Sequence, residues 1–501
     1  MSRVIYLFFL FAPFVFCFDV GVSLGIAQLR DSRKALARLE NGVRKFTLKN
    51  GLRVLMYRRA VAPVFSGVIS VRVGGSDEVP GITGISHMFE HMAFKGTTSI
   101  GTKDYRRERK LLNMLEDIQA QVHAKGWTPK LKAKWDKTHK ELEKLWSIKD
   151  FSEAYLVRGA VGLNAMTSAD TTTYVVNLPK TAFEFWCWIE SERLLRPVLR
   201  QFYQERDVVM EERRMRYENN PDGKLVELIL GTVFHVHPYR QPVIGYASDI
   251  ENLTARATEA FRKKYYVPSN MVVSIVGDVN PDEDIKTVKK YFSRIPAGPK
   301  PPRTHLVEPL QEGRRTVEYR AFASPKAAVV YRKPSYPHPD DPPLTVMMEM
   351  LAGTKSSPLY KKLVQEYGLA TSVSYYEMPG DAYPDLFWFS GVVRSPHTNK
   401  EFVDKLLEEL ESFKKDGGTE ELLEIAKNNL AMDYVTSLAS NSELAQNLAH
   451  IELVIGRWKA LISWYEEMVG VSLDDVKRVA NKYLQRDFQT IATIEPAKEG
   501  K

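Results

Sequence analysis

Two histidines and a glutamate lie close together in the run His87-Met88-Phe89-Glu90-His91. The histidines are four residues apart, so on a helix both imidazoles project from one face about one turn apart, close enough to bind a single metal ion. Glu90 lies beside them. Two neutral imidazoles and one further ligand leave an open position on zinc for water, and a nearby carboxylate can accept a proton from that water. The spacing therefore predicts a hydrolytic zinc site.

A third ligand is expected from elsewhere in the chain, preferably a carboxylate on another helix. The run 204–213 contains Glu205 and Glu212, which are seven residues apart and so share one helical face. Taken alone, such a Glu/Arg-rich segment is better interpreted as a solvated helix with internal ion pairs, with a metal ligand as the alternative. The pattern His-x-x-Glu-His is the inverted form of a zinc-protease motif, which favours the metal interpretation.

The elements around the motif can position it. A strand is expected over 64–73, a glycine-containing turn over 74–84, and then a helix over 85–94 that carries both histidines. Glycines before a helix can bind phosphate, but no Gly-Lys-Ser/Thr follows here and the spacing is wrong. We therefore set a nucleotide site aside.

Further strands and a second copy of this arrangement are expected. Asn50-Gly51 lies between two alternating stretches and predicts a hairpin, and the β-branched run 163–178 predicts a pair of strands. Beyond the proline-rich stretch 295–303, a strand and a helix ending in Gly353-Thr354 echo the segment 86–97.

The sequence therefore predicts an α+β fold of two homologous α/β units, with mixed, mostly antiparallel sheets flanked by helices. We predict an N-terminal, zinc-binding unit over 40–294, a linker over 295–316 and a C-terminal unit over 317–498.

The formal net charge of +8 is concentrated in one segment. Residues 103–149 contain 13 Lys or Arg and 7 Asp or Glu, so this segment carries +6 of the +8. Helical spacing over 103–150, broken by Gly126-Trp127-Thr128-Pro129, predicts an inserted hairpin of two charged helices. We interpret its charge as a solvated surface and expect no nucleic-acid binding.

The N-terminus is typical of an export signal. A basic start, an apolar run and small residues before Gln28 predict a signal peptide over 1–27, with an uncleaved anchor as the alternative. We expect an exported protein, periplasmic or associated with the envelope. Besides Cys17 in this segment the only cysteine is Cys187, which we expect to be a buried core residue without a disulfide.

The ordered motifs resemble the pitrilysin and insulinase family, which includes the mitochondrial processing peptidases and their bacterial relatives. The resemblance covers nearly the whole chain after about residue 40. It rests on the Asn50-Gly51 hairpin, 84–97, Asn164-Ala165, 205–212, His237-Pro238-Tyr239 and 353–370.

The resemblance implies a role for each matching residue. His87, His91 and Glu212 would bind Zn²⁺ and Glu90 would be the general base, while Glu205 would be an auxiliary carboxylate near the site. Peptide substrate would lie as an added strand near Asn164 and Ala165. His235 and His237 fall in a structural segment, so we do not expect them to bind metal.

Two departures from the family pattern bear on function. Glu212 follows His91 by 121 residues, a long separation for which the 103–150 insertion accounts. In the C-terminal half, Val364 and Thr371 stand where active members have an arginine and a tyrosine that hold substrate. Neither side chain can donate the charged or phenolic hydrogen bond.

Half-size members of the family pair two chains around a closed chamber. The resemblance therefore implies a heterodimer with a related subunit that supplies the arginine and tyrosine, and we favour this over a homodimer. The predicted function is a zinc-dependent endopeptidase acting on short or unfolded peptides. The alternative is a non-catalytic scaffold subunit of a larger complex.

Overall fold

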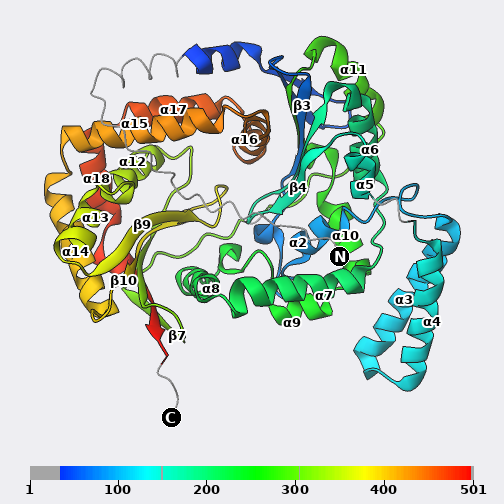
Figure 1. The fold of residues 1–501 in the computed structure, drawn as a ribbon, viewed down its shortest axis with the longest axis horizontal. Helices are drawn as coiled ribbons and strands as arrows, with labels where there is room; N and C mark the ends of the chain where they lie inside the picture. The colour runs from blue at the N-terminus through cyan, green and yellow to red at the C-terminus, as the bar shows by residue number, and fades with distance from the viewer. Residues whose placement is uncertain (1–33, 148–150, 304, 498–501) are drawn as a thin grey trace.

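The computed structural model describes residues 34–147, 151–303 and 305–497 (Figure 1). The predicted signal peptide over 1–27 lies outside these residues. Within the described part of the chain, no helix is long and apolar enough to cross a membrane.

Two mixed sheets organise the chain. The first has the order β1-β2-β6-β3-β5-β4 and the second β7-β11-β8-β10-β9. Their strands are β1 (Arg44–Thr47), β2 (Arg53–Arg58), β3 (Val64–Val71), β4 (Val161–Thr167), β5 (Thr172–Pro179), β6 (Met271–Gly277), β7 (Arg315–Ala321), β8 (Lys326–Lys333), β9 (Ala370–Met378), β10 (Asp385–Val393) and β11 (Thr490–Pro496). Among the described strands, only β2–β6 and β7–β11 pair in parallel, so the prediction of mixed, mostly antiparallel sheets is confirmed.

The two sheets share one topology. The last strand of the first sheet, β6, lies between β2 (parallel) and β3 (antiparallel), and the last strand of the second, β11, lies between β7 (parallel) and β8 (antiparallel). In both sheets an antiparallel hairpin, β5-β4 or β10-β9, then extends the edge beyond β3 or β8. Only β1 has no counterpart. In each unit a helix follows the strand that pairs antiparallel with this last strand: α2 (Ile85–Met92) follows β3, and α12 (Asp341–Ala352) follows β8. The predicted repetition of α/β units is therefore present in the fold.

Each unit contributes a helix that packs on the sheet of the other unit. The helix α16 (Asn441–Val454) from the C-terminal part packs on β3 and β6 of the first sheet, as Figure 1 shows. In return α8 (Pro221–Val233) packs on β7 and β11. Burial of both apolar faces in shared cores joins the two units.

The remaining helices flank these layers. In the first unit they are α5 (Phe151–Leu156), α6 (Phe183–Leu195), α7 (Phe202–Arg213), α9 (Ala247–Asn252), α10 (Ala255–Tyr265) and α11 (Pro281–Phe292). In the second they are α13 (Pro358–Tyr360), α14 (Asn399–Asp416), α15 (Glu420–Ser437), α17 (Ala460–Val469) and α18 (Leu473–Tyr483). The described residues between α11 and β7 form no helix or strand. The exact unit boundaries stay a prediction.

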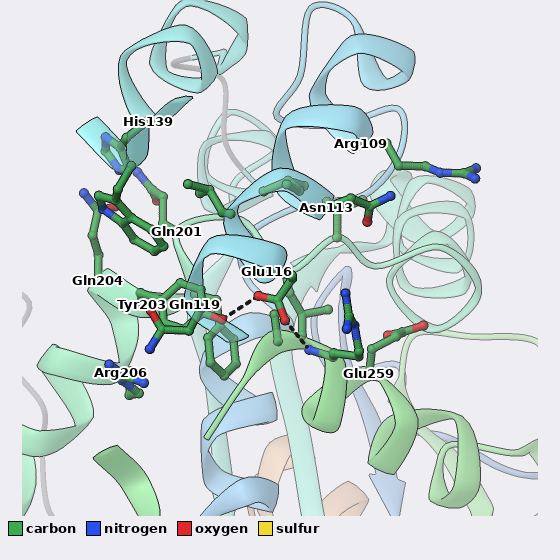
Figure 2. A pocket seen from close by; sticks show the side chains of 18 of the residues that line it. Arg109, Asn113, Glu116, Gln119, His139, Gln201, Tyr203, Gln204, Arg206 and Glu259 are labelled. Atoms are coloured by element: carbon green, nitrogen blue, oxygen red, sulfur yellow. Dashed lines mark hydrogen bonds between the residues drawn. The ribbon is translucent and has the colours of Figure 1, made fainter. Parts of the chain in front are cut away.

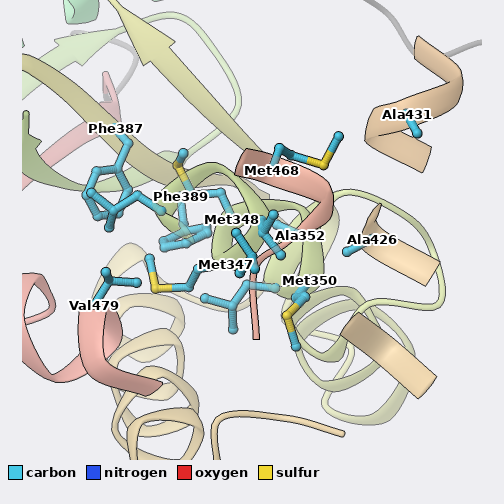
Figure 3. Packing of buried hydrophobic residues seen from close by; sticks show 14 of the residues in the cluster. Met347, Met348, Met350, Ala352, Phe387, Phe389, Ala426, Ala431, Met468 and Val479 are labelled. Atoms are coloured by element: carbon cyan, nitrogen blue, oxygen red, sulfur yellow. The ribbon is translucent and has the colours of Figure 1, made fainter. Parts of the chain in front are cut away.

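The helix α12 is buried along its whole length and lies at the centre of the second core (Figure 3). Met347, Met348 and Met350 pack with Phe387 and Phe389 of β10 in one hydrophobic cluster. Flexible methionine side chains fill irregular core space well. The second-unit counterpart of α2 is thus a packing element, whereas α2 itself carries the His-x-x-Glu-His motif.

The insertion forms the expected helical hairpin, α3 (Tyr105–Lys125) and α4 (Pro129–Leu145), which stands out from the first unit in Figure 1. Gly126 has φ +74° between them, and the Thr128 side chain caps the first turn of α4. At the base, buried Glu108 pairs with buried Arg200, with a Nε–Oε1 distance of 2.6 Å. This pair fixes the hairpin to the rest of the chain.

Candidate metal centre

The start of α2 is held by backbone geometry and by one buried carboxylate. Gly84 has φ +85°, and a Cβ there would lie 2.3 Å from the carbonyl oxygen of Ile244, so only glycine fits. Glu78 accepts hydrogen bonds from the backbone N–H of Gly84 at 2.7 Å and of Ser86 at 2.8 Å. A carboxyl group of the chain itself therefore occupies the N-terminus of this helix, a position where backbone N–H groups can also bind a phosphate.

Three predicted ligands converge at one point. Single ligand atoms of His87, His91 and Glu212 all lie within 4.8 Å of one another. Oε2 of Glu212 is 3.8 Å from Nε2 of His87 and 3.5 Å from Nε2 of His91. Packing of α7 against α2 closes the long sequence gap between them. Two imidazoles and a carboxylate are a donor set that suits catalytic zinc, so the residues fit the ion.

Glu90 lies beside this group but is not part of it. Its Oε2 accepts a hydrogen bond from Oγ1 of Thr167, at the end of β4, at 2.6 Å. Burial raises the pKa of Glu90 above its ordinary value. A buried carboxylate with one oxygen held in place and a raised pKa is suited to accept and return a proton.

Glu205 contacts the opposite side of His91. Its Oε1 lies 2.9 Å from Nδ1 of His91, and its Oε2 lies 2.5 Å from Nζ of Lys95. An acceptor at Nδ1 fixes the tautomer that leaves Nε2 free to bind metal. The structure thus places Glu205 behind a ligand rather than within the converging group.

The electrostatics of the three residues favour a cation. Burial and then the neighbouring His91 lower the pKa of His87 to about 3, which keeps this imidazole neutral. Burial alone would lower the pKa of His91, but Glu205 and Glu212 raise it to about 9. Burial alone would raise the pKa of Glu212, but His91, His87 and Arg216 lower it to about 2. Positive charge is therefore stabilised between His91 and Glu212.

The strand β4 borders this group and forms one edge of the first sheet. Asn164 is exposed and Ala165 half-buried on it, and α2 packs against the same strand. Beyond its partner β5, no described strand pairs with β4. The edge is therefore open beside the candidate metal centre, while a substrate role for Asn164 and Ala165 stays a prediction.

His237 and His235 lie away from this group. His237 is buried, its Nδ1 accepts the backbone N–H of Tyr239 at 3.2 Å, and its ring packs against the rings of Tyr239 and Tyr383. Its contacts are structural. Cys187 is buried and free, as expected for a core cysteine.

Sequence reasoning missed Glu78, Lys95 and Thr167. Each acts through a contact that depends on the folded chain, and neither its spacing nor its residue type marks it in the sequence.

Comparison with known proteins decides the family. A model described as insulinase (peptidase family M16) matches residues 53–130, and one described as peptidase M16 inactive domain matches 252–430. The zinc protease PqqE of Helicobacter pylori is 30% identical over 464 residues, covering 90% of this chain and 92% of that protein. This chain belongs to the insulinase (M16) peptidase family.

Other relatives agree with this family membership. The uncharacterized zinc protease YmxG of Bacillus subtilis is 24% identical and covers 91% of this chain. The crystal structure of a protease from Helicobacter pylori has a TM-score of 0.77 at 26% identity, covering 91% of this chain and 99% of that chain. The periplasmic protease PqqL from Escherichia coli shares the fold with a TM-score of 0.67 at 16% identity, and the match covers 47% of that longer chain.

Within this M16 fold, the two departures noted in the sequence lie on the second unit. Thr371 is exposed on β9, the edge strand of the second sheet, and its Oγ1 donates to the carbonyl of Val392 at 3.3 Å. Val364 is half-buried against the second core. Neither side chain offers a charged or phenolic donor.

Proposed function

We propose that this protein is a zinc-dependent endopeptidase that hydrolyses short or unfolded peptides. The observation that carries the proposal is the convergence of His87, His91 and Glu212 beside the buried carboxylate of Glu90. Relatives named zinc proteases support the choice of metal. A scaffold has no need of this group of four residues.

The chain's own residues supply binding and proton transfer. His87, His91 and Glu212 would hold Zn²⁺, which when bound acts as a Lewis acid toward a carbonyl oxygen and toward water. Glu90, held through Oε2 by Thr167, takes a proton from the attacking water and returns it to the leaving amine. No covalent intermediate on the protein is required.

Substrate would be captured as an extended strand on the open edge of β4, at Asn164 and Ala165. Main-chain hydrogen bonds to a sheet edge bind peptides with little regard for side chains. Thr167 at the end of the same strand contacts Glu90, so a peptide paired along β4 would run toward the general base.

We further propose that the active form is a heterodimer with a related M16 subunit. Val364 and Thr371 leave the second unit without the arginine and tyrosine that would hold substrate opposite the metal, and a partner chain would supply them. If the purified chain alone cleaves peptides at full rate, the heterodimer proposal is wrong.

We place the mature protein outside the cytoplasm, periplasmic or associated with the envelope. The basic and apolar start of the sequence supports this location, as does the shared fold with a protease described as periplasmic.

Zinc content and chelator-sensitive cleavage of a quenched peptide test the function, with the co-purifying partner present. Glu90→Gln should keep zinc and lose cleavage, whereas Glu212→Gln should lose both. Glu211→Gln on the same helix is the matched control, because Glu211 is exposed and its ion pair among the described residues is with Arg214 alone. Zinc binding without cleavage in the wild-type complex would instead favour the scaffold role.

A further inference from the structure

The positive charge of the insertion is concentrated at its free end. Residues 121–137, which we call the hairpin tip, contain five lysines and one aspartate, a net charge of +4. The flanking segments 103–120 and 138–149 carry +1 each. A helical surface that is merely solvated does not require its positive charge to gather at one end, so the uneven distribution calls for another explanation.

The lysines of the tip are exposed and mostly unpaired. Lys132 lies 3.2 Å from Asp136. The other four have no ion-pair partner among the described residues; they are Lys125, Lys130, Lys134 and Lys137. Exposed like charges gathered at one end of the hairpin repel one another, and an anionic surface against them would relieve that repulsion.

An indole lies at the apex among these lysines. Trp127 is in the turn between α3 and α4 and is 51% exposed, although tryptophan is usually well buried in soluble proteins. Its ring packs edge-to-face on Trp135 at 5.7 Å, and Nζ of Lys132 lies 5.6 Å from its centroid. An exposed tryptophan with lysines nearby in the sequence is typical of the interface between water and a lipid bilayer.

The body of the hairpin is firmly attached, so the tip has a fixed direction relative to the metal centre. Glu116 of α3 accepts a hydrogen bond from the hydroxyl of Tyr203 at 2.6 Å, a contact visible in Figure 2, and another from the backbone N–H of Arg256 at 3.0 Å. These contacts border a cavity of about 1090 Å³ between the hairpin, α7 and α10. Tyr203 belongs to α7, which also carries Glu212.

We propose that the hairpin tip docks on a bilayer containing anionic lipid, with Trp127 entering the headgroup region and the lysines facing the lipid phosphates. A bilayer fits better than an acidic protein because the lysines of the tip form a diffuse exposed cluster beside a half-exposed indole, and a diffuse cationic cluster with an interfacial tryptophan suits a sheet of anionic headgroups. Docking at this point would hold the candidate metal centre at a fixed orientation to the membrane.

Co-sedimentation of the full chain with vesicles tests the proposal. We expect binding to phosphatidylcholine vesicles that contain phosphatidylglycerol to exceed binding to phosphatidylcholine alone. Each lysine near an anionic surface contributes about fivefold in affinity, so Lys130→Gln with Lys134→Gln should weaken this binding by about 25-fold. Vesicles should also shift tryptophan fluorescence to the blue, and Trp127→Phe should remove that shift.

A matched control removes two charges from the base of the same hairpin. Arg106 and Lys110 are exposed, and Lys110 precedes Lys125 by fifteen residues on α3, about 22 Å at 1.5 Å per residue. That distance exceeds two Debye lengths at about 0.15 M salt, so Arg106→Gln with Lys110→Gln should bind vesicles like the wild type.

Other results would overturn the proposal. If the full chain binds anionic and neutral vesicles equally, the apolar N-terminal segment and not the hairpin tip is what attaches it to lipid. If the tip variant and the base variant lose the same amount of vesicle binding, the binding depends on the net charge of the protein and not on the tip. Retention on an acidic protein or a DNA duplex, without any preference for anionic vesicles, would assign the tip to another class of partner.

Discussion

Replacing Glu205 tests whether this residue supports a metal ligand or is itself a ligand. The carboxylate lies 2.9 Å from Nδ1 of His91 and 2.5 Å from Nζ of Lys95, on the side of the imidazole away from Glu212. It should therefore act on zinc only through the orientation and basicity of His91. Loss of such an outer contact typically lowers metal affinity by 10- to 100-fold, or about 1.4 to 2.7 kcal/mol.

The two substitutions at this position should differ in size. In Glu205→Gln the amide oxygen can still accept the Nδ1–H of His91, so the tautomer is kept and only the negative charge is lost. We expect about a tenfold weaker zinc affinity. In Glu205→Ala the imidazole loses its acceptor and Lys95 loses its partner, and the expected loss is about 100-fold. Glu212→Gln removes a ligand and should cost more than either.

Zinc affinity would be measured by competition with a chromophoric chelator on the purified protein, with Glu211→Gln as the control on the same helix. Thermal unfolding of each metal-free variant would show that the fold is retained. Wild-type affinity in Glu205→Ala would refute the reasoning, because His91 would then need no support. A loss in Glu205→Gln as large as that in Glu212→Gln would make Glu205 a ligand.

Three further predictions concern stability. Glu108→Gln leaves the buried guanidinium at the hairpin base without its counter-charge and should destabilise the protein by about 3–5 kcal/mol in urea unfolding, whereas Glu141→Gln on the exposed hairpin surface should change little. Gly84→Ala and Gly81→Ala both force a side chain into positive φ, which costs about 1 kcal/mol. Only the first adds a 2.3 Å contact with backbone, so thermal melts should show it to be clearly the more destabilised. Burial alone would raise the pKa of Asp340, but two cations and a phenol on α18 lower it well below its usual range. Its contribution to stability is therefore present above about pH 4 and lost as the pH falls below that value, so Asp340→Asn should be less stable at pH 7 and should lose less stability than the wild type between about pH 5 and pH 2.

Local patterns in the sequence predict much of the fold correctly. The Asn50-Gly51 turn, the helix carrying His87 and the broken helical pattern at Gly126 all occur as expected. Each depends on neighbours within a few residues, on turn chemistry or on the period of apolar residues, which a single sequence records directly.

Contacts between distant segments could not be predicted in the same way. The packing of α16 on the first sheet and of α8 on the second joins residues from about 80 to almost 400 positions apart, and nothing in the sequence of either helix identifies its partner. The same limit applied to Glu205 and Glu212. Their spacing put both on one helical face but could not decide which one faces Nε2 of His91, because that depends on how α7 lies against α2.

The insertion and the candidate metal centre meet on α7. This helix presents Glu212 to the imidazoles and Glu205 to the back of His91, while Tyr203 at its start binds Glu116 of the hairpin. The chain that separates His91 from Glu212 therefore folds back onto the helix that it precedes. The long segment between His91 and Glu212 therefore need not distort the candidate metal centre, because the inserted hairpin and the ligand Glu212 are both attached to α7. The sequence of the hairpin tip can therefore vary without disturbing the metal ligands. The lysines that lack a described ion-pair partner and the exposed indole of Trp127 lie at this tip.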